Sequence, residues 1–139
     1  MIPLEIHHVP ASETTAAESA EPLAACHEIR RVVFVEEQQV DEALEWDGLD
    51  DRADHFLAVA HDDRRPVGTA RLRIVEGEAK AERVAVLANA RVGGVGRVLM
   101  QAVEKRAGAL GCQRIVLHAQ VEALPFYERL GYEAEGPVY

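Results

Sequence analysis

A cluster of glycines between two arginines has the composition of an anion-binding turn. Gly93, Gly94 and Gly96 lie between Arg91 and Arg97. Glycines have no Cβ atom and adopt positive φ angles, so several backbone N–H groups of such a turn can point at one closely approaching phosphate group. The arginines would add positive charge at the rim. The run therefore favours phosphate binding, with a tight connection that binds no ligand as the alternative.

The residues around this turn predict a strand before it and a helix after it. Residues 82–87 are mostly apolar, and apolar side chains then recur with helical spacing until Gly111, a residue type at which helices commonly end. The first turn of a helix has unpaired N–H groups and a partial positive charge, so the glycines lie where an anion binds well. The apolar stripe consists of Val95, Leu99, Ala102, Val103 and Leu110.

Three known phosphate-binding patterns differ in the residues that accompany the glycines. A P-loop is excluded because no lysine follows them. A dinucleotide fold is poorly supported, because Leu99 stands where the third glycine belongs and Gln120 follows the next expected strand instead of an acidic residue. The remaining pattern, Arg-x-x-Gly-x-Gly over residues 91–96, resembles the acetyl-CoA loop of the GNAT acetyltransferases.

The resemblance covers most of the chain, from about Ile29 to Tyr132. Residues 82–87 look like the family's fourth strand, and residues 123–132 look like its short helix and the strand after it. The upstream part is similar to a subgroup of small, mostly uncharacterised GNAT proteins. The residues of this upstream similarity are 31–38, Asp47, Asp50 and His55.

The other elements are predicted from hydrophobic periodicity. Two strands separated by a long helix imply a parallel pair with a crossover, so the fold class is α/β, a mixed α+β sheet flanked by helices, as the GNAT-like resemblance also implies. Strands are expected at 4–9, 55–60, 67–75, 82–87 and 114–119, and helices from Pro22 to about Glu36, from 95 to 110 and from 121 to 130.

The chain is expected to form a single domain over residues 1–139. Family members usually continue past a segment like 133–139 into a final strand, so the resemblance implies that this strand is missing. A truncated chain explains this as well as a natural end does. A homodimer in which the partner subunit pairs with the open sheet edge is a further expectation.

The resemblance places acetyl-CoA, as co-substrate, in an opening where two strands splay apart. Backbone groups of Val84, Val86 and Leu87 would pair with the pantetheine amides, and Gln120 would contact the outer arm. The pyrophosphate would bind the turn between the strand and the helix. The residues of that turn are Arg91, Val92, Gly93, Gly94, Val95, Gly96 and Arg97.

Acetyl transfer to an amine needs a proton for the departing thiolate, a stabilised oxyanion and a base for the amine. Tyr127 matches the family tyrosine whose hydroxyl points at the thioester sulfur, so the resemblance makes it the general acid, although spacing alone favours a core residue. A backbone N–H near Val86 is the oxyanion candidate. Glu82, expected on the strand face of Val84 and Val86, is the first candidate for the base, and His118 is the second.

The predicted activity is therefore direct transfer of an acetyl group from acetyl-CoA to a primary amine. The alternative is a non-catalytic acyl-CoA-binding or regulatory domain of the same fold. The acceptor is expected to be a small-molecule or peptide amine.

Two polar features leave a structural and a binding interpretation open. Arg71 and Arg73 share a strand face and suit either an acidic substrate group or neighbouring carboxylates. Trp46 lies in the acidic stretch 40–52, where it suits either a substrate rim or an anchor of the loop.

Composition limits the classes of partner. Fifteen Lys and Arg residues against 24 Asp and Glu residues give a net charge of −9, which argues against nucleic acid and anionic membranes. The two cysteines, Cys26 and Cys112, lack metal-ligand spacing, so no metal site is expected. The N-terminus has no leader pattern and no stretch has the length of a membrane span, which predicts a cytoplasmic protein.

Overall fold

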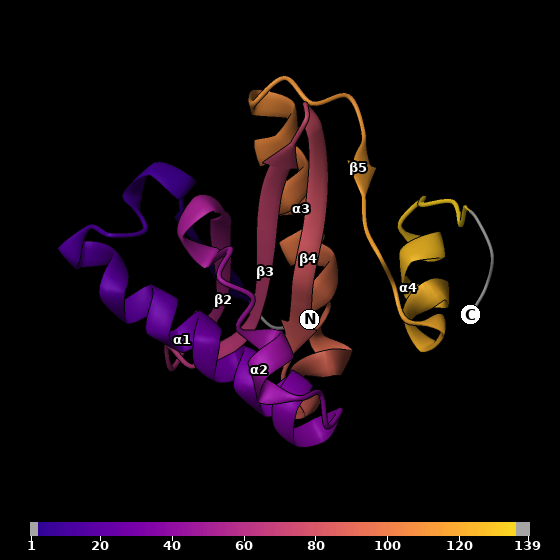
Figure 1. Ribbon diagram of the computed structural model, residues 1–139. Coiled ribbons are helices and arrows are strands. Elements are labelled where there is room, and N and C mark those ends of the chain that lie inside the picture. The colour runs from indigo at the N-terminus through magenta and orange to yellow at the C-terminus, as the bar shows by residue number, and fades with distance from the viewer. Residues whose placement is uncertain (1–2, 136–139) are drawn as a thin grey trace.

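A five-stranded mixed sheet forms the centre of the computed structural model, which describes residues 3–135 apart from the side chains of Val92 and Val121 (Figure 1). Neighbouring strands are antiparallel except for the last two, which are parallel. This arrangement confirms the predicted fold class. In spatial order the strands are β1 (Leu4–Val9), β2 (Asp54–Ala60), β3 (Pro66–Val75), β4 (Glu78–Val86) and β5 (Ile115–Val116).

Helices cover both faces of this sheet. Helix α1 (Ala20–Arg30) runs directly into a π-helical segment, η3 (Arg31–Glu37), on one face, and α3 (Val95–Ala109) covers the other. Two short helices, α2 (Glu42–Glu45) and α4 (Leu124–Arg129), complete the set (Figure 1). Short 3₁₀ segments are formed by η1 (Ala11–Glu13), η2 (Ala17–Ser19), η4 (Asp50–Arg52), η5 (Ala88–Gly93) and η6 (Val121–Ala123).

Strand β2 is buried along its whole length because both of its faces are covered. Phe56 and Ala58 pack in the core beneath α3, whereas Leu57 and Val59 pack in the core beneath α1. A strand in this position must be apolar at successive residues. The continuous apolar run in the sequence therefore reflects two hydrophobic cores on opposite sides of one strand.

Helix α3 confirms the predicted apolar stripe up to Val103 and the end of the helix before Gly111, but Leu110, the last predicted member of the stripe, is 44% exposed. Val95, Leu99 and Val103 are fully buried, and Gly111 follows the helix with a φ angle of +84°. The helix lies very close to β3, since a Cβ atom at Gly68 would be 2.8 Å from Val95 Cγ1. The glycine in the strand is thus what lets the helix approach the sheet here.

The predicted strand at 114–119 is much shorter in the structure. Only Ile115 and Val116 pair with β4, opposite Ala79 and Lys80, and residues 117–120 leave the sheet. The pairing ends at Lys80 and Val116, so the segment after β5 diverges from β4. Residues 136–139 of the expected terminal segment lie outside the described part of the chain.

Over residues 3–135, none of the helices combines the length and the apolar character that crossing a membrane requires.

Candidate active site

A cavity of about 400 Å³ lies where β5 diverges from β4. Figure 1 shows that the chain runs from β5 away from β4 and toward α4. One wall is the second half of β4, and the opposite wall consists of residues 117–120 together with Tyr127 of α4. The end of η3 and helix α2 supply a third side. The splayed strands implied by the resemblance are therefore present, and Tyr127, Glu82, Val84, His118 and Gln120 line one cavity.

A β-bulge in β4 decides which of its side chains face which helix. Arg71 lies opposite Glu82 and Thr69 lies opposite Ala85, so the single residue between them on β3 faces two residues of β4. Arg83, one of those two, has a φ angle of +53°. The extra residue reverses the alternation of side chains in the rest of the strand.

The predicted shared face of Glu82, Val84 and Val86 is wrong because of this bulge. Val84 and Val86 pack against the core beneath α3, whereas Ala85 belongs to the core beneath α1. Glu82 precedes the bulge and bonds to arginines on the α1 side of the sheet. Its carboxylate reaches the cavity from the face opposite to the two valines.

Glu82 is tightly held by two arginines. Arg73 donates to both of its carboxylate oxygens, at 2.5 and 2.9 Å, and Arg71 donates to one of them at 3.1 Å. Burial would raise the pKa of Glu82, but the hydrogen bonds from Arg73 and the charge of Arg71 outweigh it and hold the pKa below its ordinary value. The group stays ionised and has a low affinity for protons.

Arg71 is the centre of a larger set of buried and partly buried charges, here called the ion-pair network. Its side chain is 1% exposed and donates to both oxygens of Asp47, at 2.9 and 2.8 Å, and to Asp50 at 2.9 Å. Of the two interpretations of Arg71 and Arg73, the structure thus shows pairing with carboxylates of the chain. The network contains Arg30, Arg71, Arg73, Arg83, Glu45, Asp47, Asp50 and Glu82, whose formal charges cancel.

The ion-pair network fixes the acidic stretch 40–52 against α1 and the sheet. The hydrogen bond from Arg71 lowers the pKa of Asp47 to about 2. Trp46 is half-buried. The guanidinium carbon of Arg30 lies 5.1 Å from the centroid of its ring, and the ring centroids of Trp46 and His27 are 5.5 Å apart in an edge-on arrangement. Trp46 therefore anchors this stretch, and the stretch carries the α2 side of the cavity.

The glycines of the turn have different structural tasks. Gly94 has a φ angle of +76° and precedes α3, and a Cβ atom there would meet nothing within 4 Å. A Cβ atom at Gly96 would lie 2.9 Å from Cζ of Phe126 in α4. Gly94 thus gives the turn its left-handed conformation beside open space, whereas Gly96 lets the helix that carries Tyr127 pack against α3.

The backbone at the end of β4 offers fewer open groups than predicted. The Leu87 N–H donates to Val67 at 2.9 Å, and the Leu87 carbonyl accepts from Ala90 at 2.9 Å. Because successive residues of a strand point their backbone groups to opposite sides, those of Val86 point away from β3. The Nε of Arg91 donates to the Val86 carbonyl at 3.0 Å. Val84 thus lines the cavity, Val86 has its backbone directed away from β3 with its carbonyl bonded to Arg91, and Leu87 is bonded within the protein.

Tyr127 is partly buried between two other aromatic rings. The rings of Phe126 and Tyr132 meet it edge-on, with centroids at 4.9 and 6.0 Å. Burial raises the pKa of its phenol above the ordinary value of 10. Tyr127 is therefore a protonated donor at neutral pH, which is the state that a general acid requires.

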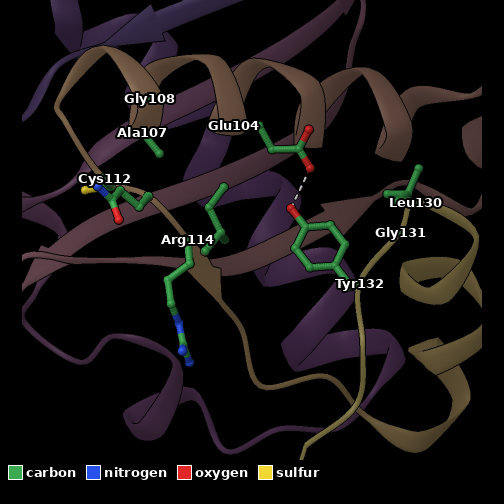
Figure 2. A pocket seen from close by; sticks show the side chains of 10 residues that line it. Glu104, Ala107, Gly108, Cys112, Arg114, Leu130, Gly131 and Tyr132 are labelled. Atoms are coloured by element: carbon green, nitrogen blue, oxygen red, sulfur yellow. Dashed lines mark hydrogen bonds between the residues drawn. The ribbon is translucent and has the colours of Figure 1, made fainter.

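A second hollow, of about 310 Å³, lies on the other side of β5. Figure 2 shows Tyr132 reaching across it toward α3, where its hydroxyl donates to Glu104 at 2.6 Å. None of the predicted site residues lines this hollow. We assign it to the packing of the segment after α4 on α3, and the chemistry to the cavity between β4 and the segment after β5.

Several lining residues of that cavity escaped the sequence analysis. Phe34, Val40, Leu44 and Arg83 all line it. A signal was present for Phe34, since residues 31–38 belong to the upstream run that resembles a GNAT subgroup. Periodicity predicted a helix up to about Glu36 but does not show that this helix ends beside β4.

Comparisons with known proteins agree with this geometry. The sequence profile of the Acetyltransferase (GNAT) family matches residues 22–132. The uncharacterized N-acetyltransferase YjcF of Bacillus subtilis (strain 168) is 40% identical over 116 residues, which cover 84% of this chain and 81% of that protein. The chain thus spans most of this relative's length.

Solved structures share the fold over nearly the whole chain. An acyl-CoA N-acyltransferase from Pseudomonas aeruginosa has a TM-score of 0.82 at 29% identity, covering 99% of this chain and 93% of its own. Escherichia coli ElaA has a TM-score of 0.76 at 26% identity, covering 97% and 95%. The chain belongs to the GNAT family of acetyltransferases.

Proposed function

We propose that the protein is an N-acetyltransferase that moves the acetyl group of acetyl-CoA directly to a primary amine. The observation that carries this proposal is the cavity between β4 and the segment after β5, which has the Tyr127 phenol on one wall. The glycine turn and the start of α3 lie at the end of β4. A thioester arm and its anionic end would thus find an open strand edge followed by a helix N-terminus.

The described residues fit acyl-CoA. Gly94 has open space where a side chain would be. Helix α3 is 15 residues long, and its first N–H groups, which have no partner within the helix, are directed at the turn. Val84 and Val86 would present backbone groups to the pantetheine arm. When bound, acetyl-CoA supplies an activated acetyl group and a thiolate leaving group.

Tyr127 would donate a hydrogen bond to the sulfur as it leaves. A thiol has a pKa near 8.5 and a phenol near 10, and burial raises the pKa of Tyr127 further. Complete proton transfer from the phenol is therefore uphill in free energy. A hydrogen bond that strengthens as charge develops on the sulfur still lowers the barrier.

Glu82 would act on the amine only through a water molecule. Its lowered pKa makes it a weak base, while an alkyl amine of pKa near 10.4 costs roughly 4 to 5 kcal/mol to deprotonate at pH 7. An acceptor whose amine has a lower pKa, such as an aromatic amine or an amino sugar, avoids most of this cost. His118, which also lines the cavity, is the second candidate for the base.

The lowered pKa of Glu82 also favours one alternative, a non-catalytic acyl-CoA-binding domain of the same fold. The two functions differ in whether the bound thioester turns over. A dependence of turnover on Tyr127 would distinguish them.

Calorimetric titration with acetyl-CoA tests the site directly. Gly94→Ala should weaken binding by severalfold or more, because the turn loses its left-handed residue. Gly77→Ala is the matched control, since Gly77 has a φ angle of +79°, no atom within 4 Å of a Cβ, and a place in the β3–β4 turn. Equal affinity of the two variants, or no binding by the wild type, would contradict the proposed site.

A further inference from the structure

Two consecutive residues at the end of η3 connect the opposite sides of the proposed acyl-CoA site. The carboxylate of Glu37 accepts from both terminal nitrogens of Arg91, each at 2.7 Å. The side-chain oxygen of Gln38 accepts from the amide nitrogen of Gln120 at 3.0 Å. Arg91 belongs to the turn before α3, and Gln120 to the segment after β5.

The resemblance to the GNAT acetyltransferases implies that these two partners, Arg91 and Gln120, contact acyl-CoA. Arg91 lies at the phosphate end and Gln120 at the pantetheine end, on opposite sides of the opening. Both are occupied by the chain itself. The end of η3 therefore spans the opening, and Gln38 also lines the cavity beneath.

The positive charge of Arg91, which the proposed site needs for the pyrophosphate, is neutralised by Glu37. Glu37 holds both terminal nitrogens, the Nε donates to Val86, and the pair with Glu37 raises the pKa of Arg91. The Glu37 carboxylate also places a negative charge next to the glycine turn. An incoming pyrophosphate and this carboxylate therefore compete for the same guanidinium.

We propose that Glu37 and Gln38 form a clasp that competes with acyl-CoA for Arg91 and Gln120, and that binding of acyl-CoA releases the clasp. The proposal rests on the proposed acyl-CoA site. It makes Glu37 a positioning residue that sets the affinity for the pyrophosphate.

Release of the clasp would also change the wall of the cavity that contains Phe34 and Val40. The Gln38 N–H donates to the Val33 carbonyl at 3.0 Å, and the Val40 N–H donates to the Phe34 carbonyl at 2.8 Å, so this segment is one hydrogen-bonded unit. Phe34 and Val40 line the cavity. π-Helical segments are frequent at functional sites. Binding of acyl-CoA would thus reshape the wall that an amine meets.

Glu37→Gln tests the clasp, with Glu36→Gln as the matched control. Glu36 is the preceding residue and pairs with Arg31 instead of Arg91, so both variants lose the same charge one residue apart. Each would be titrated calorimetrically with acetyl-CoA and with S-acetylpantetheine, which lacks the pyrophosphate. Glu37→Gln should bind acetyl-CoA about two- to fivefold more tightly than the control, which is the size expected for an exposed ion pair. Its affinity for S-acetylpantetheine should match the control.

The outcomes separate the clasp from the proposed function. Acetyl-CoA binding to Glu37→Gln that equals or is weaker than binding to the control overturns the clasp but leaves the site intact. A wild-type protein that binds neither ligand overturns the proposed function, and the clasp with it. Hydrogen exchange gives a second readout, since amides of residues 36–40 should exchange faster when acetyl-CoA is bound. Slower exchange there would also contradict release.

Discussion

The two halves of strand β4 have opposite roles. Residues 78–81 all pair with β3, Ala79 and Lys80 also pair with β5 on the other edge, and the side chains of Ala79 and Ala81 are buried. Residues 82–86 pair with β3 and contain the bulge, and within the described residues β5 does not extend beside them. The first half is a piece of sheet core, and the second half is a wall of the cavity.

This difference shows how one strand provides both stability and a site. An unpaired strand edge presents free N–H and C=O groups, which ordinarily invite aggregation. Here the edge is enclosed by residues 117–120, by Tyr127 and by the end of η3. The interruption of pairing thus leaves a cavity beside the second half of β4. Four predictions compare the two halves.

The largest expected effect comes from the ion-pair network behind the second half. Arg71→Met should lower the free energy of unfolding by about 3 kcal/mol, because it leaves three carboxylates without their shared buried partner. Arg114→Met is the control. The side chain of Arg114 is 64% exposed and pairs with Glu78 of the first half, so we expect the free energy of unfolding to fall by less than about 0.5 kcal/mol. Urea denaturation of both variants measures the difference, and equal losses would contradict the assigned role of burial.

A smaller effect is expected where β3 lies opposite the end of β4. Gly68→Ala should cost about 1 to 3 kcal/mol, because the added methyl group meets Val95 at 2.8 Å, Leu99 at 3.0 Å and the Ala85 carbonyl at 3.2 Å. Gly108→Ala, in α3 with no atom within 4 Å, should instead stabilise by a few tenths to 1 kcal/mol. Thermal unfolding monitored by circular dichroism would show opposite signs. A neutral Gly68→Ala would mean that α3 can move away from the sheet.

Tyr127→Phe should affect turnover and leave the fold unchanged. If the phenol assists the leaving thiolate, kcat for release of the free thiol should fall on the order of tenfold or more, with an unchanged affinity for acetyl-CoA. Thiol release would be measured with an amine identified from an acceptor screen. Unchanged turnover would remove Tyr127 from the mechanism and favour the role of a packing residue.

The smallest effect concerns the acid limb of stability. The pKa of Asp47 is lowered from 3.8 to about 2, so its contribution to stability is complete above about pH 5 and is lost as the pH falls toward 2. Asp47→Asn should remove less than about 1 kcal/mol at neutral pH, since the group is partly exposed. The variant should then lose less stability than the wild type between pH 5 and 2. Parallel pH curves would show that Asp47 is not the titrating group.

Several elements were predictable because their signals are local. The apolar stripe from Val95 to Val103 and the glycine after α3 predicted that helix, and the continuous apolar run at 55–60 predicted a strand. The glycine turn needed a residue that tolerates a positive φ angle, and Gly94 has it.

The bulge could not be predicted, because nothing in the sequence around Arg83 distinguishes a bulged strand from a regular one. A single extra residue there placed Glu82 on the face opposite Val84. Register is set by the neighbouring strand, and one residue of shift reverses every following side chain.

The sequence by itself determined the fold class, the glycine turn at the start of α3 and the residue types available for acyl transfer, because periodicity and glycine conformation act over a few residues. Only the tertiary structure decided that Arg71 and Glu82 neutralise each other and that Glu37 and Gln38 occupy Arg91 and Gln120. Those contacts join residues 11 to 82 positions apart. Their geometry depends on where a π-helix ends and a strand bulges, and no local pattern encodes either.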